Sequence, residues 1–220
     1  MMSRLRLKAL LALGAAVLPG AVVAQVAGLP VRNAGIGTGI GVAVDAGFPN
    51  GAAGKGFAVG AMGSAGLGPF GVTASVAHWK PKGESSVNSV GATGNLKIFG
   101  GPLIPVSVTL QVGAARSSQD QSTQLEPLKV RTWHVPVGLG LALTIPNPVF
   151  SIKPWIAPRI DIVRTTVEAD TPPESHTDKH FGISGGVDAG FLNGISVRVM
   201  YDKVSSVSIL SLGLGFRVGL

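Results

Sequence analysis

The amino-acid sequence predicts an all-β protein, a closed antiparallel up-and-down transmembrane β-barrel. Three observations lead to this prediction. The chain of 220 residues begins with a pattern typical of export, it is rich in glycine and poor in charge, and its apolar residues alternate with small or polar ones. Alternation with a period of two is typical of strands with one apolar face. In a membrane, only helices and closed barrels satisfy every backbone hydrogen bond.

The first 24 residues have the pattern of a secretory signal peptide. Arg4, Arg6 and Lys8 precede an apolar run from Ala9 to Val17, and Val22-Val23-Ala24 is a small-residue cleavage site. A membrane-anchoring helix is the alternative, but the apolar run is too short to span a bilayer. We therefore expect cleavage after Ala24.

Removal of this segment leaves two parts. We expect a periplasmic N-terminal segment over 25–34 and an outer-membrane β-barrel over 35–220. The formal charge of +7 falls to +4 without the three signal-peptide cations, which leaves 15 Lys and Arg against 11 Asp and Glu. No basic cluster is interleaved with aromatic residues, so we expect no nucleic-acid partner. Cysteine is absent, and backbone hydrogen bonding must hold the fold together.

Ten stretches of the remaining chain show the alternation. In 106–115, for example, Val, Leu and Ala occupy one face and Ser, Thr, Gln and Gly the other. Most stretches reach the roughly 9–11 residues that a tilted strand needs to cross a bilayer. An even number is typical of single-chain bacterial barrels, and eight strands would follow if one pair is misread. The predicted strands are Gly35–Phe48, Gly56–Leu67, Phe70–Trp79, Val87–Phe99, Val106–Arg116, Leu128–Thr144, Val149–Arg164, Phe181–Phe191, Ile195–Lys203 and Val207–Val218.

The links between these strands alternate in length. Tight turns at 68–69, 100–105, 146–148 and 192–194 alternate with more polar links at 49–55, 80–86, 117–127, 165–180 and 204–206. This asymmetry is typical of periplasmic turns and extracellular loops, and it would place both termini in the periplasm. Pro136, Pro154 and Pro158 fall inside strands, so we expect bulges or a shifted boundary there.

Aromatic residues lie near the strand ends on the apolar face. They predict two girdles, one at each membrane interface. The loop-end girdle comprises Phe48, Phe57, Trp133, Phe181 and Tyr201, and the turn-end girdle Phe70, Phe150, Phe191 and Phe216. Trp79, Phe99 and Trp155 do not fit this pattern.

The signal peptide, the alternating strands and the closing segment together resemble small bacterial outer-membrane β-barrels of the OmpA/OmpX type. The stretch from Ser211 to Val218 is similar to their assembly signal, with Gly213, Phe216 and Val218 at its characteristic positions. The family usually ends on Phe or Trp, whereas this chain ends Gly219-Leu220. The resemblance implies an outer-membrane monomer surrounded by lipid and lipopolysaccharide and inserted by the barrel-assembly machinery. It implies no single activity.

Charged residues on the inward face are nearly balanced in sign. Balanced charges in a narrow barrel should pair, because an unpaired, poorly hydrated charge is costly. The sequence therefore predicts a largely plugged lumen with a network of nine charges. These are Asp45, Lys97, Lys153, Arg159, Asp161, Asp188, Arg198, Asp202 and Arg217.

Few residues suggest chemistry. His176 and His180 lie in a polar stretch, Glu174 to His180, and we interpret it as a solvated loop, since we expect only a helix to bring both imidazoles to one face. The glycine run from Gly35 to Gly41 lacks the spacing of a phosphate-binding loop. We therefore expect no catalytic, metal or cofactor site. A structural or surface-interaction role is the leading hypothesis. A narrow solute channel and a lipid-modifying enzyme are the alternatives.

Overall fold

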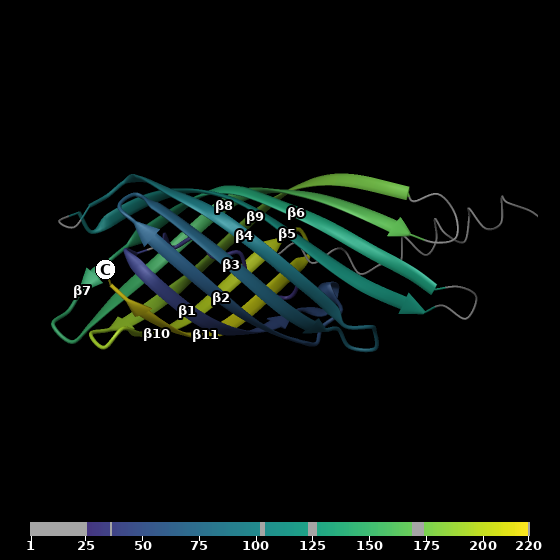
Figure 1. Ribbon diagram of the computed structural model, residues 1–220, viewed down its shortest axis with the longest axis horizontal. Coiled ribbons are helices and arrows are strands. Elements are labelled where there is room, and N and C mark those ends of the chain that lie inside the picture. Colours follow the sequence, from purple (N-terminus) through teal and green to yellow (C-terminus); the bar gives the residue numbers. More distant parts are fainter. Residues whose placement is uncertain (1–25, 36, 102–103, 123–126, 169–173, 220) are drawn as a thin grey trace, which may run out of the picture.

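The computed structural model describes residues 26–35, 37–101, 104–122, 127–168 and 174–219, and in them ten long strands wrap into one barrel (Figure 1). A two-residue strand, β7, follows β6, and a short 3-10 helix, η1, links β1 to β2. The elements are β1 (Gly39–Pro49), η1 (Gly51–Ala53), β2 (Phe57–Leu67), β3 (Phe70–Lys80), β4 (Val87–Phe99), β5 (Val106–Ser122), β6 (Pro127–Leu143), β7 (Ile145–Pro146), β8 (Phe150–Glu168), β9 (Glu174–Phe191), β10 (Ile195–Val204) and β11 (Val207–Val218).

The barrel closes with every long strand antiparallel to both neighbours. Consecutive strands pair in order, β1 pairs with β11, and β8 pairs with both β6 and β9. The predicted closed, ten-stranded, up-and-down barrel is therefore confirmed. No helix among the described residues is long and apolar enough to cross a membrane. Below, the loop end is the end that carries the β1–β2, β3–β4, β5–β6, β8–β9 and β10–β11 links, and the turn end is the opposite one.

Three strands are several residues longer than the sequence predicts. β5 continues to Ser122, β8 continues to Glu168 and β9 already begins at Glu174, so the predicted loops 117–127 and 165–180 are mostly strand. The polar residues there signalled loops, but a hairpin needs no apolar face once its backbone groups pair across the ladder. β1, in contrast, begins at Gly39 rather than Gly35, because Gly35 has a φ of 72° and lies inside the barrel.

The prolines inside strands cause no shift of register. The β5–β6 and β6–β8 ladders skip the pairs near Pro136 and Pro158 and then resume in the same register. The predicted bulges at these prolines are therefore wrong. A register shift occurs instead in the β4–β5 ladder between Lys97 and Phe99, and it leaves both Ile98 and Phe99 exposed. This bulge explains why Phe99 did not fit the alternation.

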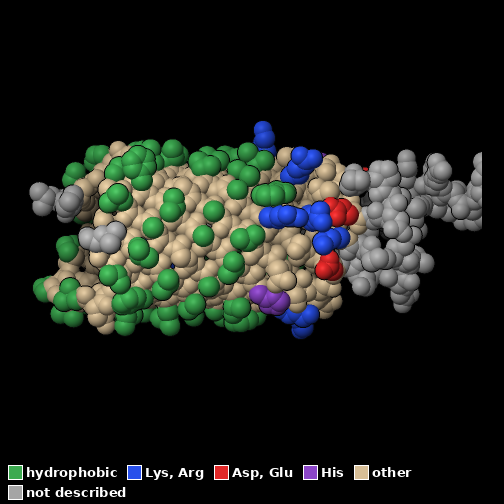
Figure 2. Space-filling view, viewed as in Figure 1, with side chains coloured by type: hydrophobic (Ala, Val, Ile, Leu, Met, Phe, Trp, Pro, Cys, Tyr) green, Lys and Arg blue, Asp and Glu red, His purple; other side chains and the backbone are tan. Residues whose placement is uncertain are grey.

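Burial alternates along the parts of the strands that form the barrel wall, so the barrel has an apolar outside and a mixed inside. Large apolar side chains cover the outer surface (Figure 2), and Ile40, Val42 and Val44 of β1 are each more than half exposed. On β6 this outward row runs from Trp133 to Leu143. Ten residues span about 33 Å along a strand, or about 25 Å along the axis of a barrel tilted by about 40°. That height matches the apolar band of transmembrane barrels.

Candidate functional site in the barrel lumen

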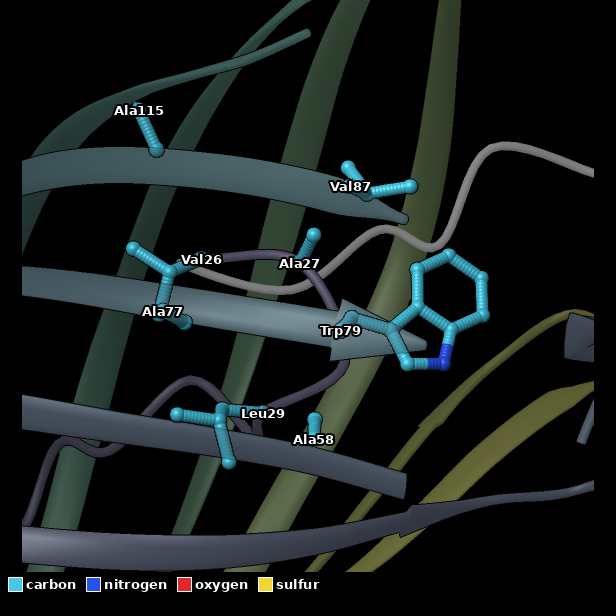
Figure 3. Packing of buried hydrophobic residues seen from close by; sticks show 8 residues of the cluster. All are labelled: Val26, Ala27, Leu29, Ala58, Ala77, Trp79, Val87 and Ala115. Atoms are coloured by element: carbon cyan, nitrogen blue, oxygen red, sulfur yellow. The ribbon is translucent and has the colours of Figure 1, made fainter. Parts of the chain in front are cut away.

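The lumen is occupied by the chain's own residues 26–35, which we name the inner segment. At the loop end its Val26, Ala27 and Leu29 are buried in a hydrophobic cluster with side chains of the wall (Figure 3). From there the chain runs toward the turn end, where the carbonyl of Gly37 accepts a hydrogen bond from Arg217 of β11. The wall members of the cluster are Ala58, Ala77, Trp79, Val87 and Ala115.

Polar contacts from several strands fix the inner segment along its length. The carboxylate of Asp188 forms an ion pair with Arg32, and the other contacts use backbone groups of the segment or its Asn33 side chain. Buried backbone groups require such partners. The hydrogen bonds are Ala27 N to Ser89 Oγ (3.0 Å), Val31 N to Asp202 Oδ2 (2.8 Å), Gln111 Nε2 to Arg32 O (2.9 Å) and Asn33 Nδ2 to Thr109 O (3.3 Å). The segment is thus an integral part of the lumen.

Inward glycines of the wall make room for it. A Cβ at Gly140 would lie 2.1 Å from the carbonyl oxygen of Asn33, and one at Gly47 would lie 2.2 Å from the carbonyl oxygen of Gly28. Both contacts are with backbone, which cannot move aside as a flexible side chain can. The small face predicted from sequence is therefore the surface on which the inner segment lies.

The inner segment corrects the expected domain organisation. We expected 25–34 to lie in the periplasm beside the turn end, but Val26 lies inside the barrel at the loop end. The physical reason is the composition of the stretch from Val26 to Val31, which is apolar and gains from burial. The apolar run directly after the expected cleavage site indicated that this stretch would be buried, because apolar side chains in an exposed periplasmic segment would remain in contact with water.

The ion pair of Arg198 and Asp45 joins β10 to β1 across β11. Arg198 donates to both carboxylate oxygens, at 2.7 and 3.0 Å, and both side chains are buried. The pair lies over Gly213 of β11, where a Cβ would be 1.9 Å from Oδ1 of Asp45. The bidentate geometry is the strongest form of this contact.

A second network lies nearer the loop end. Arg159 donates to Asp161 at 2.9 Å and to Asp202 at 2.8 Å, and His134 lies 2.7 Å from Asp161. These side chains come from β6, β8 and β10, and none is more than 6% exposed. Because Asp202 also accepts from Val31, the network holds the inner segment as well as the wall. Sequence reasoning overlooked His134, although its position on the inward face of β6 indicated it.

The remaining charges of the predicted network lie toward the turn end. Lys153 is within electrostatic reach of Lys97, Arg217, Arg32 and Asp188. Arg217 donates to the carbonyls of Gly37 and Gly39 and to Ser64 Oγ. The nine charges are nearly balanced by count but not in space. The turn end is cationic, whereas the loop-end network carries two carboxylates against one guanidinium.

The stretch from Glu174 to His180 is the start of β9 rather than a loop. On a strand, residues four apart share a face, so the expectation that only a helix would align His176 and His180 is wrong. His176 lies 2.9 Å from Asp178 and is largely exposed. No group of His, Asp and Glu residues suited to a metal ion occurs among the described residues. The Asp–His pair of the lumen, His134 and Asp161, is buried and tied to Arg159.

The aromatic side chains divide between the two faces. Eight of the nine girdle residues are at least 44% exposed on the outer surface, and Phe150 is half-buried. Phe48 and Phe57 contact each other with ring centroids 5.6 Å apart. The two tryptophans that did not fit point inward. Trp79 belongs to the hydrophobic cluster of Val26, and Trp155 belongs to a second buried cluster that contains Ala34 of the inner segment. The exposed group comprises Phe48, Phe57, Phe70, Trp133, Phe181, Phe191, Tyr201 and Phe216.

The residues of the expected assembly signal lie on β11. This last strand pairs with the first strand, β1, and so closes the barrel. Phe216 and Val218 point outward and are about half exposed, whereas Gly213 points inward beneath the Asp45–Arg198 ion pair. Gly213 therefore has a packing role in the folded barrel, whatever its part in assembly.

Comparisons with known proteins found similar solved structures but no matching family. No family model and no curated protein sequence matches the chain. Among solved structures, the translocator domain of the autotransporter NalP from Neisseria meningitidis aligns over 97% of this chain and 98% of its own, with 14% identity and a TM-score of 0.45. The outer membrane protease OmpT from Escherichia coli aligns over 82% and 94%, with 10% identity and a TM-score of 0.43.

The attachment invasion locus protein Ail of Yersinia pestis is a third similar structure. It aligns over 83% of this chain and 100% of its own, with 10% identity and a TM-score of 0.40. The three proteins differ in role, so the likeness carries no function to this chain. The chain is a closed, ten-stranded antiparallel up-and-down β-barrel.

Proposed function

We propose that the protein is a non-enzymatic outer-membrane β-barrel whose lumen is closed by its own inner segment and whose role lies at the cell surface. The exposed apolar band and the aromatic residues at both of its edges support a membrane location. At the loop end β5, β6, β8 and β9 extend past the apolar band, and connections that project further on one side support an orientation with that side outside.

The observation that carries this proposal is the path of the inner segment. Its residues Val31, Asn33 and Ala34 are each at most 3% exposed, and its contacts reach β4, β5, β9 and β10. A pocket beside it, lined among others by Arg32, Asn95 and Gln111, has a volume of about 10 Å³. That volume holds about one water molecule, which supports a closed lumen.

A surface role is supported by the four long strands. β5, β6, β8 and β9 extend past Trp133 at the loop end as a paired ribbon. Its side chains are mainly Ser, Thr, Gln and charged residues. The backbone of such a ribbon is already ordered by its strand pairing. A partner can therefore bind its polar side chains without the entropy cost of ordering a loop.

Planar bilayers test the closed lumen. The protein purified from outer-membrane fractions should give no stable conductance steps, whereas a variant that lacks residues 26–34 should give them. Both should show heat-modifiable gel migration, which reports a folded barrel. Stable open steps from the intact protein would refute the proposal in favour of a narrow channel. Silence from a folded deletion variant would show that the inner segment is not what closes the lumen.

A further inference from the structure

The described strands carry their outward-facing charges at one end of the barrel. Among the described strand residues, every charged side chain that faces outward lies at the loop end, beside or beyond the aromatic residues there (Figure 2). Among the described strand residues, the outward side chains at the rim of the turn end are apolar, such as Leu67, Phe70 and Ile195. Cations predominate in the charged group, which comprises Lys80, Arg116, Asp120, Lys129, Arg131, Arg164, Glu168, Lys179 and Lys203.

The strand register gathers part of this group into one row. Arg116 of β5 lies directly beside Trp133 of β6, which lies directly beside Arg164 of β8. The next strand places Thr177 beside Arg164 and Lys179 beside Ile162. With neighbouring strands about 4.8 Å apart, the two arginines flank the indole at about 10 Å from each other.

The row has the chemistry of a site for a phosphorylated headgroup. The guanidinium of Arg116 lies over the Trp133 ring, 5.9 Å from its centroid, and this contact holds it at the level of the apolar band. Within the described chain, neither Arg116 nor Arg164 forms an ion pair, whereas Arg131 is paired with Glu168 at 2.5 Å. The row therefore places two guanidinium groups, an ammonium group and a hydroxyl on four neighbouring strands, with the exposed indole between the two arginines.

We propose that Arg116, Trp133, Arg164 and Lys179 form a binding site for the phosphate of a lipid headgroup in the outer leaflet. Arginine presents paired N–H donors that match phosphate oxygens. On the side of the row that faces the turn end, Phe181 and Ile160 are exposed and would contact the acyl chains of the same lipid. This combination favours a lipid over a free phosphate, which has no apolar part. The inference rests on the proposed outer-membrane orientation but not on the closed lumen.

The test measures retention of a phosphorylated lipid by the folded protein. The full chain in detergent is incubated with lipid A, or with lipid A from which the phosphates have been removed, and the bound lipid is counted by native mass spectrometry. We expect preferential retention of the phosphorylated form. The double variant Arg116→Gln/Arg164→Gln should retain it about thirtyfold less, since each cation near an anionic membrane surface contributes about 1 kcal/mol.

Matched variants separate the outcomes. Lys55→Gln/Lys82→Gln removes two exposed loop cations and should leave retention unchanged, whereas Arg116→Lys/Arg164→Lys should restore part of it. Heat-modifiable migration verifies that each variant is folded. Equal retention of both lipid forms, or no loss in the double variant, would refute the site. Competition by millimolar inorganic phosphate alone would indicate a free-anion site instead. Failure here leaves the bilayer test of the closed lumen unaffected.

Discussion

Arg198 and Asp45 are 153 positions apart in the chain and form a buried, bidentate ion pair directly above the backbone of Gly213. The pair ties β10 to β1 across the strand between them, at the place where the last part of the chain meets the first. Its geometry depends on the absence of a side chain at Gly213, so a glycine determines whether two distant charges meet.

Substitution of Gly213 tests this relationship. In Gly213→Ala the new methyl group would overlap Oδ1 of Asp45, so the ion pair should separate and leave two buried charges poorly paired. Breaking such a pair costs about 3 kcal/mol, and urea unfolding of the refolded protein in detergent should show a loss of that order by tryptophan fluorescence. Gly63→Ala is the control, because nothing lies within 4 Å of a Cβ there. Equal stability of the two variants would contradict the assignment.

The position of the inner segment can be tested with thiol labelling, since the chain contains no cysteine. Val31 is 1% exposed, so in Val31→Cys the thiol should resist a membrane-impermeant maleimide until the barrel is unfolded. Ser206 lies in the exposed hairpin between β10 and β11, and Ser206→Cys should react at once. Rapid labelling of both variants in folded protein would place the segment outside the lumen.

A bulky residue at Gly140 should displace the inner segment without deleting it. In Gly140→Val, the side chain would overlap the carbonyl of Asn33. We expect the otherwise intact chain to give conductance steps in planar bilayers and to label at Val31→Cys. Gly94→Val adds the same side chain at a position with nothing within 4 Å of the Cβ, and it should stay silent. Equal silence of both variants would show that the segment does not depend on this contact.

The charge distribution predicts the selectivity of the opened pore. Without residues 26–34, the turn end keeps Lys97, Lys153 and Arg217 against Asp188, while Asp45 and Arg198 neutralise each other. A pore mouth with excess positive charge favours anions. The reversal potential across a potassium chloride gradient should therefore indicate chloride preference, and Lys153→Glu should reduce it. Cation preference in the deletion variant would contradict the assigned separation of charge.

The strand alternation was sufficient to predict the barrel. In a transmembrane strand each residue faces either lipid or lumen. Apolar residues therefore alternate with small or polar ones in segments such as 106–115 and 207–218. The same local rule predicted the inward direction of Asp45, Arg198 and Arg159 and the outward direction of Trp133. Local rules were less reliable for the polar ends of β8 and β9, because ladder pairing there is decided by the partner strand rather than by an apolar face.

The sequence by itself predicted the barrel, the up-and-down order of its strands and most of the outward-facing side chains, because these depend on residues close together in the chain, and it left the strand number open between ten and eight. Only the tertiary structure decided which inward charges meet, since register and closure bring Asp45 to Arg198 and His134 to Asp161. It also decided the place of the inner segment, whose residues Val26 to Val31 carry no period. Their burial becomes favourable only inside a barrel whose glycines, on strands far apart in sequence, leave room for a passing backbone.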